Sequence, residues 1–100
     1  MKKTFTITEG KGFTIQFDNG IVLSTQFGSM NYCENRSMNI SSEFPKFKES
    51  NNAEIAVWNE KGDWVTKQMM KELGKETNDD VEGWVKLSGW LKILDWCRNQ

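Results

Sequence analysis

Hydrophobic and polar residues alternate along the first quarter of the chain. Residues 4–8, 13–17 and 21–27 place apolar side chains at every second position, with mostly threonine, serine or glutamine between them. A period of two is typical of β-strands that bury one face. Glycine-containing turns separate the three runs. The pattern therefore predicts three consecutive strands joined by short turns.

An Asn-Gly pair in the second of these turns allows two hairpin registers. A two-residue turn would place Phe17 opposite Val22 and divide the apolar residues between the two faces of the sheet. A three-residue loop over residues 18–20 pairs Phe17 with Ile21 and keeps the apolar residues on one face, with Gly20 in the left-handed region. We predict the three-residue loop.

The second half of the chain combines strands with helical spacing. Residues 53–58 alternate like a strand, and a polar turn follows at residues 60–63. Two methionines and a leucine are then spaced as on one face of a short helix. Thr66 is its expected N-cap and Gly74 its expected end.

The last twenty residues predict a strand and a closing helix. Residues 81–85 form a short strand pattern, and Ser88 is the expected cap of the helix that follows. One face of this helix carries an apolar stripe made of Trp90, Ile93, Leu94 and Cys97. The predicted fold class is α+β: an antiparallel sheet of hairpins, one short helix, and a C-terminal helix packed on one face.

The chain is short enough to form one domain, residues 1–100. Its hydrophobic content of 37% and its five tryptophans are sufficient for a core without a metal or a disulfide. Residues 28–52 have no regular period and predict a long irregular loop. Loops of this length in a compact domain are often functional.

Charge and hydropathy argue against two classes of partner. Thirteen basic and fourteen acidic residues give a net charge of −1, so the chain lacks the basic excess that bulk DNA or RNA binding requires. A local pocket for one small anion stays compatible with this balance. No apolar run reaches the ~20 residues of a membrane helix, so we expect no membrane association.

The reactive residues argue against an enzyme. The chain has no histidine, the usual general base near neutral pH. Its two cysteines, Cys33 and Cys97, lie far apart in sequence and are expected to be free thiols. No nucleophile, base and orienting group are recognisable together. We expect a binding protein with no cofactor and no metal site.

Several blocks of the chain resemble a group of small uncharacterised proteins from phages and prophages. The resemblance covers most of the chain, and the block Asn31–Arg36 is its most specific part. The other blocks are Phe17–Gly20, Gln26–Gly28, Ala53–Trp58 with Gly62–Trp64, and Asp79–Val85. The resemblance implies a viral protein that acts inside a bacterial cell. It supplies no functional residues, but many small phage accessory proteins counter bacterial defence systems.

The block 31–36 concentrates groups that suit a nucleotide. It offers two amides, an aromatic ring and a guanidinium, from Asn31, Tyr32, Asn35 and Arg36. An aromatic ring can stack on a base, amides can hydrogen-bond to its edge, and a guanidinium can hold a phosphate. A purely structural interpretation competes with this one and is favoured, because such loop compositions are common: the amides stabilise turns, the ring joins the core, and the guanidinium pairs with Glu34 or Glu43.

The tryptophans also have two interpretations. Four of them occupy positions expected to face a core: Trp58, Trp64, Trp84 and Trp90. Trp96 lies off the apolar stripe of the closing helix and is therefore a candidate anchor for a partner or a second subunit. We expect a homo-oligomer with Trp96 at or beside the interface.

Two functions follow as hypotheses. The first is an anti-defence protein that sequesters a small phosphate-bearing nucleotide signal of a bacterial immune system. The second is an inhibitor that binds a host defence or metabolic protein. Both act in the host cell cytoplasm. A structural role in the virion fits less well, because the chain is short and lacks coiled-coil character.

Overall fold

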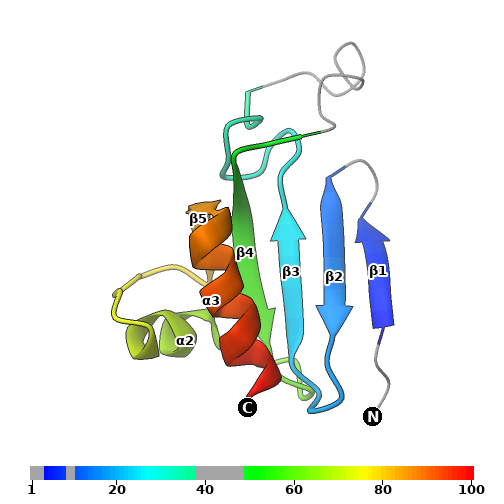
Figure 1. Ribbon diagram of the computed structural model, residues 1–100, viewed down its shortest axis with the longest axis vertical. Helices are drawn as coiled ribbons and strands as arrows, with labels where there is room; N and C mark the ends of the chain where they lie inside the picture. Colours follow the sequence, from blue (N-terminus) through cyan, green and yellow to red (C-terminus); the bar gives the residue numbers. More distant parts are fainter. Residues whose placement is uncertain (1–3, 9–10, 38–48) are drawn as a thin grey trace.

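The strands form a single antiparallel meander. In the computed structural model, which describes residues 4–8, 11–37 and 49–100, the sheet has the order β1-β2-β3-β4-β5 (Figure 1). The strands are β1 (Thr4–Thr8), β2 (Gly12–Gln16), β3 (Val22–Gln26), β4 (Asn52–Trp58) and β5 (Val81–Lys86). Helix α2 (Thr66–Glu72) lies between β4 and β5 in the chain, and α3 (Leu87–Arg98) follows β5 directly.

The hairpin between β2 and β3 has the predicted three-residue loop. The Phe17 amide donates to the Ile21 carbonyl at 2.9 Å, and Gly20 adopts a φ of 89°. Ile15 consequently lies opposite Leu23 on the apolar face. Because a side chain strains the left-handed region, glycine is the residue that best closes this loop.

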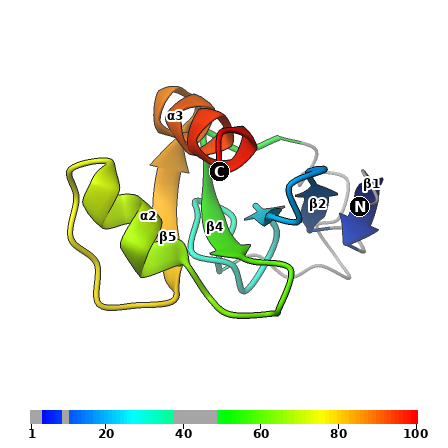
Figure 2. The same ribbon diagram turned by 90° about the horizontal axis from the view of Figure 1, so that it is seen from below.

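One face of the sheet carries the core. Helix α3 lies across β4 and β5 in both views (Figures 1 and 2). It buries Ile93 and Cys97 against Leu23 of β3 and against Ile55 and Val57 of β4. Trp90 and Leu94 pack beside them, and α2 adds two buried methionines. The α+β architecture, with the C-terminal helix on one face of the sheet, is confirmed.

Both expected helix caps were wrong. Helix α3 already begins at Leu87, and its N-cap residue Lys86 makes no side-chain capping bond. Strand and helix are thus continuous, which leaves Ser88 inside the first turn. Thr66 also lies inside its helix, where its buried hydroxyl accepts a bond from the Val57 amide at 2.9 Å and donates to the Val57 carbonyl at 3.3 Å. It ties α2 to β4 instead of capping α2.

Two of the four tryptophans assigned to the core are in fact exposed. Trp64 and Trp84 each keep 53% of their surface accessible. Trp64 packs at a tilt of 58° against the partly buried Trp58, with ring centroids 5.4 Å apart, at the point where the chain turns back beside β4. The sequence pattern placed Trp84 correctly in a strand, whereas Trp64 forms only an isolated bridge with Trp58. The pattern could not indicate which positions the helices cover.

Coverage of the apolar face is uneven. Figure 2 shows α3 above β4 and β5, while its side of β1 and β2 carries no helix. Phe5 and Ile7 on β1 are 82% and 84% exposed. Among the described residues, no helix is long and apolar enough to span a membrane.

Candidate binding surfaces

The two asparagine side chains of the block 31–36 form hydrogen bonds that stabilise the loop. The Asn31 side chain accepts a bond from the Gly28 amide at 3.0 Å and donates to the Glu54 carboxylate at 3.3 Å. Asn35 is buried, and its amide donates to the carbonyls of Phe27 at 2.8 Å and Glu49 at 3.2 Å. These contacts agree with the structural interpretation, in which the amides stabilise the turn.

The aromatic ring and the guanidinium of this block lie together at the surface. The Arg36 guanidinium carbon is 4.3 Å from the centroid of the Tyr32 ring, a cation–π contact. Tyr32 is 41% exposed. The sequence therefore identified one exposed pair, Tyr32 with Arg36, and two amides that face inward to the loop.

The same loop docks on a bulge in β5. Ala53 lies opposite Val85 and Ile55 opposite Glu82, so two residues of β5 stand against Glu54 alone. One of the two is Trp84, which has a φ of 56°. Its amide donates to the Tyr32 carbonyl at 2.8 Å.

Trp84 combines strain with exposure. A left-handed conformation is unfavourable for a bulky residue and recurs at functional sites. At the neighbouring bulge position, Gly83, a Cβ atom would lie 2.7 Å from the Cβ of Tyr32. The bulge thus fits only glycine at position 83, and the indole of Trp84 is exposed at the edge of the sheet.

Two grooves flank Trp84. One, of about 320 Å³, lies between α2 and α3 over β5 and carries Lys86 and Lys92. The other, of about 450 Å³, includes Tyr32 and Thr77. Lys75 lines both grooves and forms an ion pair with the buried Glu82.

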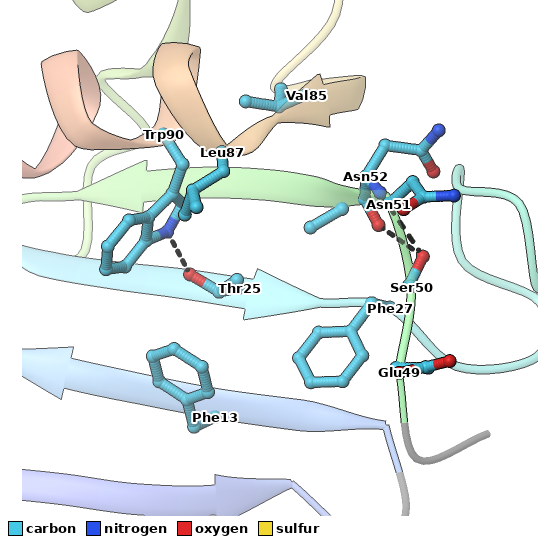
Figure 3. A pocket seen from close by; sticks show the side chains of 11 residues that line it. Phe13, Thr25, Phe27, Glu49, Ser50, Asn51, Asn52, Val85, Leu87 and Trp90 are labelled. Atoms are coloured by element: carbon cyan, nitrogen blue, oxygen red, sulfur yellow. Dashed lines mark hydrogen bonds between the residues drawn. The ribbon is translucent and has the colours of Figure 1, made fainter.

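A third groove is mainly apolar and lies beside α3. It has a volume of about 320 Å³, and its lining comes from β2, β3, the segment that leads into β4, β4 itself, β5 and the start of α3 (Figure 3). The Trp90 indole donates to the buried Thr25 hydroxyl at 2.8 Å and meets the Phe13 ring edge-to-face, with centroids 6.4 Å apart. Phe27 and Leu87 complete the aromatic and aliphatic lining.

This apolar groove continues onto a larger exposed surface. The flank of α3 adds Leu87, 70% exposed, and Leu91, 53% exposed. On the sheet, Phe5 lies opposite Ile15, and Ile7 opposite Phe13. The period of two in residues 4–17 predicted this apolar face. It could not predict that α3 would leave the face uncovered at β1 and β2.

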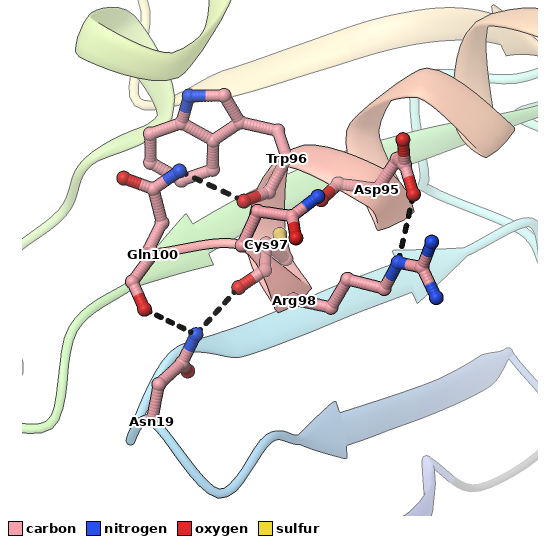
Figure 4. A network of polar contacts seen from close by, with 7 residues as sticks. Asn19, Asp95, Trp96, Cys97, Arg98 and Gln100 are labelled. Carbon is pink, nitrogen blue, oxygen red and sulfur yellow. Dashed lines mark hydrogen bonds and ion pairs between the residues drawn. The ribbon is translucent and has the colours of Figure 1, made fainter.

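Trp96 makes both polar and apolar contacts within its own chain. Its indole donates to the Glu72 carboxylate at 3.0 Å, which lowers the pKa of Glu72, and its ring packs against the core. Beside it, the Asn19 amide donates to the carbonyls of Cys97 at 2.8 Å and Gln100 at 3.1 Å (Figure 4). These bonds join the β2–β3 loop to the end of α3. A role of Trp96 in an interface stays a prediction.

Both cysteines are buried free thiols. Burial raises the pKa of Cys33, and it raises the pKa of Cys97 to about 12. A thiol needs a lowered pKa to act as a nucleophile near neutral pH, so neither environment favours that chemistry. Within the described part of the chain, no group of acidic or cysteine side chains is arranged to hold a metal ion.

Comparison of the chain with protein-family models, with curated proteins and with solved structures finds no match.

Proposed function

We propose that this protein is an inhibitor that binds an amphipathic helix of a host protein in the groove between α3 and the β1–β2 face. The observation that carries the proposal is the uncovered apolar surface beside α3, where Phe5 and Ile7 are more than four-fifths exposed. Large exposed apolar surfaces in single domains commonly mark binding sites.

The shape of this surface favours a helix as the occupant. Leu87, Leu91 and Leu94 follow one another at intervals of four and three residues along α3, the spacing that packs against a neighbouring helix. Helices pack about 8–10 Å apart. Neighbouring strands are about 4.8 Å apart, so a second helix at that distance from α3 would lie about two strands away, over β3 and β2, with β1 beside it.

The groove also offers an anchor point for such a helix. Phe13, Phe27 and Trp90 surround a hollow into which one large apolar side chain of the partner can insert. Aromatic anchors in desolvated pockets supply most of the binding energy of protein interfaces. The resemblance to phage proteins is the reason to propose a host protein, met in the cytoplasm of an infected bacterium.

A matched pair of variants on α3 tests the groove. Leu87→Asp places one negative charge inside it, and Ser88→Asp places the same charge on the next residue, which lines the other flank of the helix. Loss of one buried leucine contact of roughly 1.5–3 kcal/mol corresponds to a roughly 10–150-fold weaker affinity. The host polypeptide captured by the parent, and a synthetic peptide of its helix, provide the ligands for calorimetry. Equal affinity of both variants would place the interface elsewhere.

The nucleotide-binding hypothesis is the second candidate, because Trp84 at the bulge combines a strained backbone with an exposed indole. Trp84 and Tyr32 present two aromatic rings at one edge of the sheet, and the adjoining groove carries Lys86 and Lys92. An indole can stack on a base for about 1–3 kcal/mol, and the lysines can neutralise phosphates. Among the predicted residues, Tyr32 and Arg36 would contribute from the rim.

A thermal-shift panel of cyclic and ADP-ribose-type nucleotides tests this candidate. A ligand at ~100 times its dissociation constant adds about 2.7 kcal/mol of stability. Stabilisation of the parent that is lost in Trp84→Leu and weakened in Arg36→Ala supports the site. No stabilisation by any nucleotide of the panel rejects it and leaves the helix-binding proposal untouched.

A further inference from the structure

The outer edge of β1 carries a second interaction surface. Strand β1 ends the sheet, and no other strand in the described part of the chain pairs with that edge. Natural proteins usually protect such edges with charged residues, prolines or bulges. Residues 4–8 read Thr-Phe-Thr-Ile-Thr and contain neither a charge nor a proline.

The hydrogen-bond pattern shows which backbone groups face this edge. Within β2 and its turn, the Phe17 amide points to β3, because it donates to the Ile21 carbonyl. Backbone groups alternate between the two sides of a strand, so Thr14 points to β1, where it lies opposite Thr6. The amide and carbonyl groups of Phe5 and Ile7 therefore point outward.

We propose that β1 pairs antiparallel with β1 of a second copy of this chain, across a two-fold axis at Thr6. The strand is symmetric about Thr6, so this register places Phe5 opposite Ile7 of the second copy and each terminal threonine opposite the other. The outward groups of the two strands then exchange four hydrogen bonds. The two five-stranded sheets become one continuous sheet.

Other registers are less favourable. A shift by one residue would pair apolar with polar side chains on each face. A shift by two would leave either Phe5 or Ile7 without an apolar residue of β1 opposite it. Only the register centred on Thr6 matches both apolar residues of both copies. A five-residue contact buries less than a standard interface, so we expect reversible association at micromolar concentrations.

The dimer would join the exposed faces of both copies into one apolar floor between two α3 helices. Four neighbouring strands, β2 and β1 of each copy, would form this floor over a width of roughly 14–19 Å. This floor then has room for partner helices beside each of the two α3 helices. The β1 pairing stands independently of the proposed function, because it uses backbone groups and not the groove.

Single cysteine variants test the register directly. In Thr6→Cys, the two new thiols face each other across the axis at a Cα separation of about 4.5 Å, which suits a disulfide. In Thr4→Cys, on the same face of the strand, they lie roughly 13 Å apart along the strands. The native thiols are buried and do not compete. Mild oxidation should crosslink Thr6→Cys into dimers and leave Thr4→Cys mostly monomeric. Equal crosslinking of the two variants, or none of Thr6→Cys, overturns the proposal.

Sedimentation over a concentration series supplies the second test. The parent should approach twice the 11.6 kDa of one chain. Ile7→Pro removes an outward amide and leaves the bonds between β1 and β2 in place, so it should stay monomeric with an unchanged circular dichroism spectrum. Leu87→Asp, in the groove, should dimerise like the parent. A monomeric parent refutes the pairing, and so does an Ile7→Pro variant that dimerises.

Discussion

Trp84 provides the sharpest test of the link between backbone strain and function. Its φ of 56° lies in a region that glycine enters freely and other L-residues enter at a cost of roughly 1–2 kcal/mol. Replacement by glycine or by alanine removes the same indole contacts. The difference in unfolding free energy between Trp84→Gly and Trp84→Ala therefore reports the strain of the left-handed backbone, reduced by the extra entropy of glycine in the unfolded chain.

The sign of this difference distinguishes the bulge from a regular strand. In a strand, glycine is less stable than alanine by roughly 0.5–1 kcal/mol. At position 84 the relief of strain exceeds the extra entropy of glycine in the unfolded chain, roughly 0.4–1 kcal/mol. We expect Trp84→Gly to be more stable than Trp84→Ala by about 0.5–1 kcal/mol, or a few degrees in Tm.

Urea denaturation of four variants measures the effect. Thr14, in the middle of β2 between Thr6 and Ser24, supplies the control, and there the alanine variant should be the more stable of the pair. If glycine is no better than alanine at position 84, the left-handed bulge is not present in solution. A stabilised Trp84→Gly that also loses ligand or partner binding would show that strain is retained for function.

Three further predictions concern contacts made by buried groups. Thr66→Val should lower the unfolding free energy by about 1–3 kcal/mol, because it leaves the Val57 amide unpaired. Thr66→Ser keeps the hydroxyl, so its unfolding free energy in urea denaturation should fall by less. Asn35→Ala should cost about 1–3 kcal/mol and Arg36→Ala under about 1 kcal/mol; the reverse order would contradict the structural role of the amide. Cys97 should resist alkylation at pH 8 until the protein unfolds. Since the pKa of Cys97 is higher in the folded than in the unfolded chain, stability should be intact below about pH 8.5 and fall as pH rises towards 12, and Cys97→Ala should reduce this loss.

Local sequence patterns were sufficient to predict which strands and helices this fold contains. Alternation with period two marked the strands, and the apolar stripe marked the closing helix. The choice of a three-residue loop followed from one requirement, that Phe17 and Ile21 share a face, and the structure has that loop. The end of α2 just before Gly74 likewise follows from a local preference. Gly74 has a φ of 93°, a conformation that glycine adopts more readily than other residues.

The candidate site depended on contacts between segments distant in the chain. The composition of the block 31–36 could not show that Asn35 would donate to the carbonyls of Phe27 and Glu49, since those partners come from other segments. The exposure of Trp84 depends on a bulge in the pairing of β4 with β5. Neither feature has a local sequence signal.

The open face of β1 and β2 was decided by tertiary structure alone. The sequence determined that Phe5 and Ile7 share one face with Phe13 and Ile15, because side chains alternate along a strand. It did not determine that α3 would follow β5 without a loop and lie over the far half of the sheet. The described helices, α2 and α3, cover only part of the five-stranded sheet. Strand order and helix position decide which apolar residues are buried, and these depend on packing across the whole domain.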